Sequence, residues 1–209
     1  MTDINQQREE AGQRLWLSRA RAIQSYANVE HGLCALLAAF AQTDIHSATV
    51  IMFKIGAHPR NAILDDLMDY RYRDEYGTFW RSLMKRVRRL DGVRNNIVHW
   101  HEYIGLTATT ATVGLSRPAT WYSSSGISTM SVSAIDEFSA ECGFVGRLLN
   151  VFHSHLLGKL KVDDPDDKPW HGVFKEPIAY PPPEAHPLYP FWQEEHCEPR
   201  GTDDQRTGA

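Results

Sequence analysis

The chain has 209 residues and is 42% hydrophobic, which is enough for one buried core and an appendage. It has no uninterrupted apolar run of about 18 residues, and residues 1–10 are polar and acidic, unlike an export signal. We therefore expect a cytoplasmic protein without a membrane anchor. The net charge of −4 is unevenly spread, because residues 163–209 hold 11 acidic and 4 basic side chains. The body before them is slightly basic.

Helical periodicity dominates the first half of the chain. Apolar residues three and four positions apart predict a long helix over residues 6–40. A short helix is expected over 46–55, and a third over 61–72. After Gly77, Thr78 can cap a fourth helix that runs to the stretch beginning at Arg94. Trp16 and Trp80 fall on apolar stripes, so we expect both in the core.

The pattern changes after Gly105. Residues 107–115 and 120–133 are rich in Thr, Ser and β-branched side chains, which predicts a β-hairpin. Ser133, followed three positions later by Asp136, is a capping-box start for a last helix that reaches about Leu160.

Nine of the eleven prolines lie between residues 165 and 199, where they remove backbone donors and argue against any regular element. The predicted fold is all-α. It consists of a bundle of four to five helices in residues 1–161, with a small β-hairpin inserted before the last helix, and an acidic Pro-rich extension in residues 162–209. The three cysteines lie far apart and predict neither a disulfide framework nor a zinc site.

The fourth predicted helix ends in RNNIVH, residues 94–99. Asn95 and His99 are four positions apart and share a helical face, and the Arg94 side chain is long enough to reach the same point. RNNIVH resembles the R-N-x-x-x-H signature of the HEPN superfamily of RNA-cleaving toxins and defence proteins, and the resemblance extends over roughly residues 6–160. Some members continue with a tyrosine two positions after the histidine. Here that position is His101, and Tyr103 comes two later.

The resemblance implies a helical domain that forms a homodimer, with two copies of the motif making one RNA-cleaving site. It gives Arg94 the role of binding phosphate, Asn95 that of orienting and His99 that of transferring protons. It also implies an antitoxin or a defence-system partner. The chemistry is sound by itself, because RNA is cut by its own 2′-hydroxyl once a base, an acid and a cation are in place. We expect no metal and no cofactor.

Four basic residues precede the motif at helical spacing, namely Arg81, Lys85, Arg88 and Arg89. Together with His101 they predict a surface that binds the RNA backbone. The alternative is a solvated helix face. The motif itself also has two other interpretations. One is a HEPN-like module that binds or dimerises without catalysis. The other is an ordinary helix end, where the helix dipole favours Arg and His.

The extension mixes prolines with aromatic residues in AYPPPEAHPLYPFW, residues 179–192. This composition suits a peptide that docks on a partner, or a strap that covers a groove of the body. The third interpretation is a disordered extension.

Overall fold

The structure is a computed structural model that describes residues 4–106, 111–118 and 128–196. The described helices are α1 (Ile4–Ala41), α2 (Ile45–Lys54), α3 (Ala57–His99), α4 (Val132–Leu156), α5 (Lys168–Val173) and α6 (Tyr189–His196). The described strands are β1 (His101–Leu106), β2 (Ala111–Ser116) and β3 (Thr129–Ser131). The prediction of a mostly helical fold is confirmed. Parts of the predicted hairpin, at 107–110 and 119–127, and the end of the extension lie outside the described residues.

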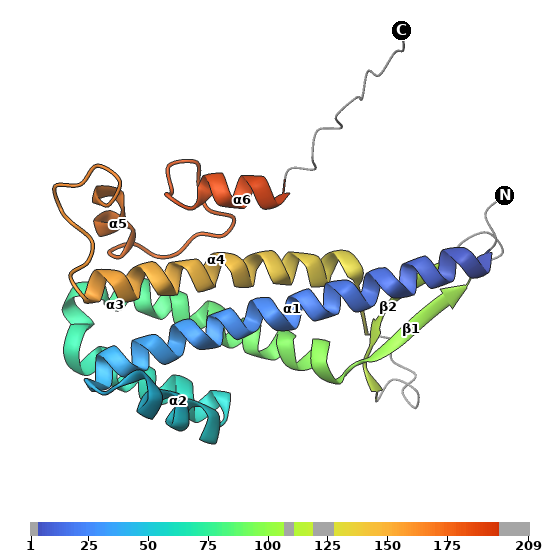
Figure 1. Ribbon diagram of the computed structural model, residues 1–209, viewed down its shortest axis with the longest axis horizontal. Helices are drawn as coiled ribbons and strands as arrows, with labels where there is room; N and C mark the ends of the chain where they lie inside the picture. Colours follow the sequence, from blue (N-terminus) through green and yellow to red (C-terminus); the bar gives the residue numbers. More distant parts are fainter. Residues whose placement is uncertain (1–3, 107–110, 119–127, 197–209) are drawn as a thin grey trace, which may run out of the picture.

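Helices α1 and α4 lie side by side along the length of the molecule (Figure 1). They run parallel and approach closely at Gly32, where a Cβ would lie 2.8 Å from the Cβ of Leu149. Three contacts place the second half of α3 antiparallel to α1. Arg19 bonds to Val98, Tyr26 bonds to Asp91, and Phe40 packs on Trp80. The core fills the space between these three helical segments.

Helix α3 folds back on itself. Arg60 and Asp91 are 31 positions apart, a separation of roughly 46 Å along a straight helix, yet Arg60 Nη2 lies 3.0 Å from Asp91 Oδ1. Figure 1 shows the turn at the end of the molecule farthest from the N-terminus. The sequence predicted two helices separated near Gly77. The two segments are present, but the predicted break between them is wrong, because helical backbone continues through the buried Gly77.

The bend is held by packing instead of by a loop. Tyr76, next to Gly77, contacts the ring of Phe152 at a centroid distance of 5.3 Å and lies 2.9 Å from Nε2 of His155. Tyr72 packs on Phe40 at 5.9 Å. Aromatic contacts with α1 and α4 therefore fix the turn.

The predicted hairpin is a three-stranded antiparallel sheet in the order β1-β2-β3. The first strand begins at His101, opposite Ser116 on β2. It starts six residues before the predicted hairpin, which was expected from residue 107. Trp100 has extended backbone, with φ −79° and ψ 148°, and joins the end of α3 directly to β1. As a result, His99 ends a helix and His101 begins a strand.

Helix α4 begins and ends earlier than predicted. Its N-cap is Ser131, whose Oγ accepts from the Ala134 amide at 3.2 Å, and not Ser133. Its end precedes Gly158, which has a φ of +67° and so takes the left-handed conformation that stops helices. Trp80 is buried as predicted, but Trp16 is 53% exposed, so its predicted place in the core is wrong.

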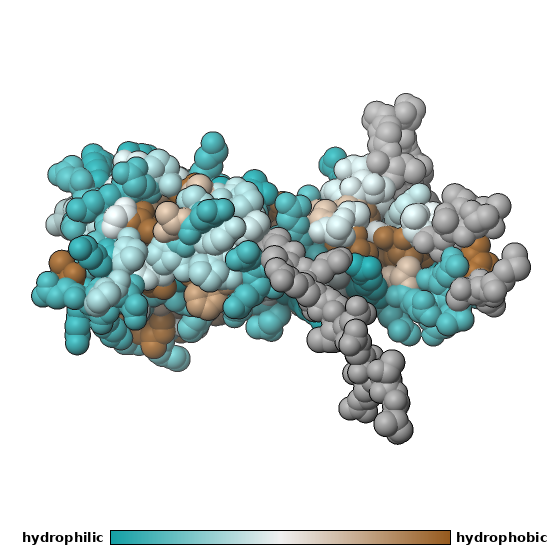
Figure 2. Space-filling model, turned by 90° about the horizontal axis from the view of Figure 1, so that it is seen from above, coloured by the Kyte–Doolittle hydropathy of each residue, from teal (hydrophilic) through white to brown (hydrophobic). Residues whose placement is uncertain are grey.

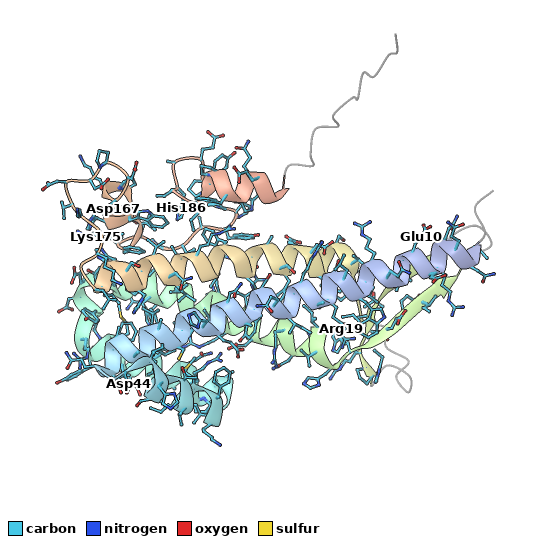
Figure 3. The ribbon with its side chains drawn as sticks, viewed as in Figure 1. Glu10, Arg19, Asp44, Asp167, Lys175 and His186 are labelled. Carbon is cyan, nitrogen blue, oxygen red and sulfur yellow. The ribbon has the colours of Figure 1, made fainter. Side chains whose placement is uncertain are left out.

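The extension packs on the α3–α4 side of the bundle, and Figure 3 shows His186 and Asp167 above α4. Phe174 is buried among core rings, and the Ile178 amide donates to Ser82 Oγ at 2.7 Å. The expectation that the extension lacks regular structure is wrong, because α5 and α6 form within it. Each of these helices carries its proline near the start, at Pro169 and Pro190. Proline is tolerated in the first turn of a helix, where its missing N–H has no intrahelical partner.

With the extension in place, the face seen in Figure 2 is largely polar, with scattered apolar patches. No single helix of the described chain has the length and apolar character needed to cross a membrane. Helices α1 and α2, which meet at a bend of 118°, pass that test as a pair on length and composition alone.

Candidate functional site

A pocket of about 250 Å³ lies where α1, α2 and the two halves of α3 meet. We call it the Arg94 pocket. Its lining residues are Tyr26, Glu30, Met52, Phe53, Ile55, Ala57, Arg60, Asp91, Arg94 and Asn95. The fold-back of α3 creates it, because it brings the first turn of that helix against the last turns.

The floor of the Arg94 pocket is a buried polar network around Arg60, which is 4% exposed. The Arg60 guanidinium bonds to Glu30 Oε1 at 3.1 Å and to Asp91 Oδ1 at 3.0 Å. Asn61 Nδ2 donates to the other Asp91 oxygen at 2.7 Å, and the Tyr26 hydroxyl donates to Asp91. A buried guanidinium needs partners of this kind to offset its lost hydration.

Tyr26 serves as a fixed donor in this network. Burial raises the pKa of its hydroxyl far above the ordinary value, and the hydrogen bond to Asp91 raises that pKa further. The hydroxyl therefore stays neutral and orients the carboxylate of Asp91. It is not available as a base near neutral pH.

Arg94 and Asn95, two of the three predicted catalytic residues, meet at this pocket. Arg94 Nη1 donates to Asn95 Oδ1 at 3.3 Å, and the guanidinium carbon lies 5.7 Å from the centre of the Tyr26 ring. In the described chain Arg94 makes no ion pair, unlike Arg60 on the pocket floor. Asn95 thus aligns a guanidinium whose charge has no carboxylate partner.

His99 lies one turn beyond Asn95, as the last residue of α3. Its side chain is exposed and is not among the residues that line the Arg94 pocket. It makes no hydrogen bond with any part of the chain that the structure describes. The chain therefore brings Arg94 and Asn95 together at the pocket and leaves His99 outside its lining.

The predicted RNA-binding residues divide into two groups. Arg88 pairs with Asp65, and Arg89 pairs with the buried Glu141. Arg81 and Lys85 are exposed and make no ion pair within residues 4–106, 111–118 and 128–196. His101 is exposed on β1. Three of the five predicted contacts are thus available to a ligand, whereas two are held by internal carboxylates.

Sequence reasoning missed Arg60, Asp91 and Glu30. Asp91 is three positions before Arg94, so it shares a helical face with the motif, and this signal was available. Arg60 carried no such signal, because only the fold-back of α3 places it beside residues 31 or more positions later in the chain.

The part of the chain that the structure describes contains no group of three or more His, Cys, Asp or Glu side chains arranged to hold a metal ion. The chain matches no family model, no curated protein and no solved structure.

Proposed function

We propose that the chain is a metal-independent endoribonuclease of the toxin or antiviral-defence type, with a HEPN-like helical domain that acts as a homodimer in the cytoplasm. The observation that carries the proposal is Arg94. It lines a pocket and has no carboxylate partner in the described chain, whereas Arg60, Arg88 and Arg89 all have one. A guanidinium that makes no ion pair, and that a neighbouring amide aligns, suits a phosphate group.

The proposed reaction uses the RNA's own 2′-hydroxyl. A base takes its proton, and the oxygen attacks the adjacent phosphorus while Arg94 stabilises the charge on the phosphate oxygens. The bond to the 5′-oxygen breaks, and that oxygen receives a proton from an acid. The products are a 2′,3′-cyclic phosphate and a 5′-hydroxyl. Histidine can perform either proton transfer near neutral pH.

A homodimer would supply both the base and the acid. One protomer offers a single exposed His99, and a second copy would bring another to the same cleft. Trp16 and Ile23 support such an interface, because both are exposed and lie seven positions apart on one face of α1. Arg19, between them, lies over the Trp16 ring and donates to Val98 O at 2.8 Å. This apolar pair therefore lies beside the end of α3 that carries His99.

Arg81 and Lys85 would guide the RNA backbone, with His101 as a further contact. For a single strand, each phosphate contact contributes about 0.7 to the slope of log affinity against log salt. Lys85→Ala should therefore reduce the slope by about that amount. Arg89→Ala should leave the slope unchanged and lower stability, because its guanidinium is already paired with Glu141.

The test is cleavage of single-stranded RNA by the purified full chain in excess chelator. His99→Ala should abolish cleavage and leave the fold intact, because the side chain is exposed. His46→Ala, which changes an exposed histidine of α2, is the matched control and should cut at the parent rate. Arg94→Lys should fail as well, since a point charge does not replace the guanidinium fork.

The products distinguish this reaction from other nuclease chemistry. RNA fragments should end in 2′,3′-cyclic phosphate, and DNA of the same sequence should stay uncut because it lacks the attacking hydroxyl. A His99→Ala variant that cuts at the parent rate would show that His99 does not transfer the protons. Activity that is lost in chelator and restored by magnesium would assign the chain to another class of nuclease.

One observation favours a second candidate, a non-catalytic HEPN-like module that binds or dimerises. His99 lies outside the Arg94 pocket, so a single protomer does not bring the proton carrier to the phosphate site. In this alternative RNA binds through Arg94 and is released intact. If the protein is a dimer in solution and binds RNA without cutting it, the non-catalytic module is the correct function.

A further inference from the structure

A second pocket, of about 270 Å³, adjoins the Arg94 pocket between α1 and α2. We call it the α1–α2 pocket. The two pockets share four lining residues: Glu30, Met52, Phe53 and Arg60. A ligand bound at Arg94 can therefore extend into the α1–α2 pocket without leaving the protein surface.

The walls of the α1–α2 pocket suit a flat aromatic group. Phe53, in the last turn of α2, is 75% exposed. Thr49, one turn before Phe53 on α2, is already bonded within the chain. Thr49 Oγ1 donates to Ile45 O at 2.7 Å and lies 3.3 Å from Cys34 Sγ. The pocket thus combines the exposed Phe53 ring with the apolar side chains of Ala27 and Met52. Its lining also holds polar groups, among them the Glu30 carboxylate, which is an acceptor.

A nucleotide has the same arrangement of parts, with a flat ring that carries N–H donors on one side and a phosphate on the other. We propose that the α1–α2 pocket binds one base of the RNA, stacked on Phe53, while a neighbouring phosphate lies at Arg94. This inference rests on the proposed function and adds a base-binding subsite to it. Stacking on an aromatic side chain accepts any base, so the pocket does not select a sequence. Only an RNA no longer than the site keeps one register on the protein.

Binding of labelled single-stranded RNA to the full chain, measured by fluorescence anisotropy, tests this subsite. His99→Ala serves as the parent so that the RNA stays intact. Phe53→Ala should weaken binding about tenfold, the usual effect of losing one stacked base, and Phe53→Trp should retain it. Tyr70→Ala is the matched control. Tyr70 is 85% exposed and lines neither pocket, so its loss should leave binding unchanged.

A set of RNAs that each lack one base locates the subsite. At one position, removal of the base should weaken binding to the parent by the same factor as Phe53→Ala, and it should have no further effect on the Phe53→Ala variant. Phe53→Ala binding with parent affinity would overturn the proposal. An equal loss of affinity for intact and base-free RNAs, together with a changed sedimentation coefficient of the protein, would also overturn it. Phe53 would then be a contact between two copies of the chain.

Arg94→Ala separates this proposal from the function on which it rests. If Arg94→Ala weakens RNA binding and Phe53→Ala does not, the base subsite fails and the RNA site stands. If Arg94→Ala binds RNA as tightly as the parent, the phosphate site fails, and the base subsite fails with it.

Discussion

Replacement of Phe174 by alanine tests whether the proline-rich extension is part of the folded body. The Phe174 side chain is fully buried, and its ring centroid lies 5.2 Å from that of Phe79, 5.0 Å from Phe152 and 4.9 Å from His155. Truncation of a buried Phe costs about 3–5 kcal/mol. We expect Phe174→Ala to lower the free energy of unfolding by about that amount, as measured by urea denaturation followed by circular dichroism.

The matched control is Phe191→Ala, in the same extension but half-exposed. It loses only a contact with the Arg147 guanidinium, which lies 5.3 Å from the ring centre, and should lower the free energy of unfolding by at most about 1 kcal/mol. A loss of under about 1 kcal/mol for Phe174→Ala would refute the reasoning, because the extension would then detach before the body unfolds. Salt should not alter the loss, since the contacts are apolar. Ion pairs between an acidic tail and a basic groove would weaken with salt.

Three further results are expected. Asp91→Ala removes a partner from a buried guanidinium and should cost about 3–5 kcal/mol in thermal or urea unfolding. Gly32→Val should cost about 1–3 kcal/mol by overpacking the contact between α1 and α4, whereas Gly92→Ala, where a Cβ meets nothing within 4 Å, should not destabilise. Burial lowers the pKa values of His155 and His186 below the ordinary value of 6.5. The unfolded chain therefore binds protons first, and the free energy of unfolding should fall as pH drops below about 6.5; a pH-independent value between pH 7 and 5 would contradict this.

Local signals in the sequence predicted the long helices well, because their apolar stripes are buried against one another. The same apolar pattern wrongly placed Trp16 in the core. The buried face of α1 at this point runs through Leu15, Ser18 and Ala22. Trp16 lies one position from Leu15, about 100° around the helix from that face. The end of α4 was predictable in principle, since Gly158 is a usual helix-stopping residue. Proline near the start of α5 was also a compatible signal.

The sequence could not show that α3 bends without a break at Gly77, because a glycine at such a position usually indicates a loop between two helices. Here Tyr76 and Phe79, on either side of Gly77, are both buried, and their packing keeps the backbone helical through the turn. The site depends on that packing. Without the bend Arg60 would be far from Asp91, and the pocket that Arg94 lines would not exist.

The charges of the Arg94 pocket balance before any ligand binds. The buried Arg60 lies between Glu30 and Asp91, so two carboxylates face one guanidinium, and Arg94 brings the total formal charge of these four groups to zero. A phosphate at Arg94 would therefore add uncompensated negative charge unless a further cation were present. The free Arg81 and Lys85 lie 13 and 9 residues before Arg94 on α3, roughly 20 and 13 Å along the helix. In the proposed homodimer, a second copy would present its own Arg94 and His99 to the same phosphate. In the proposed function, a second copy would supply both this further cation and the second proton carrier.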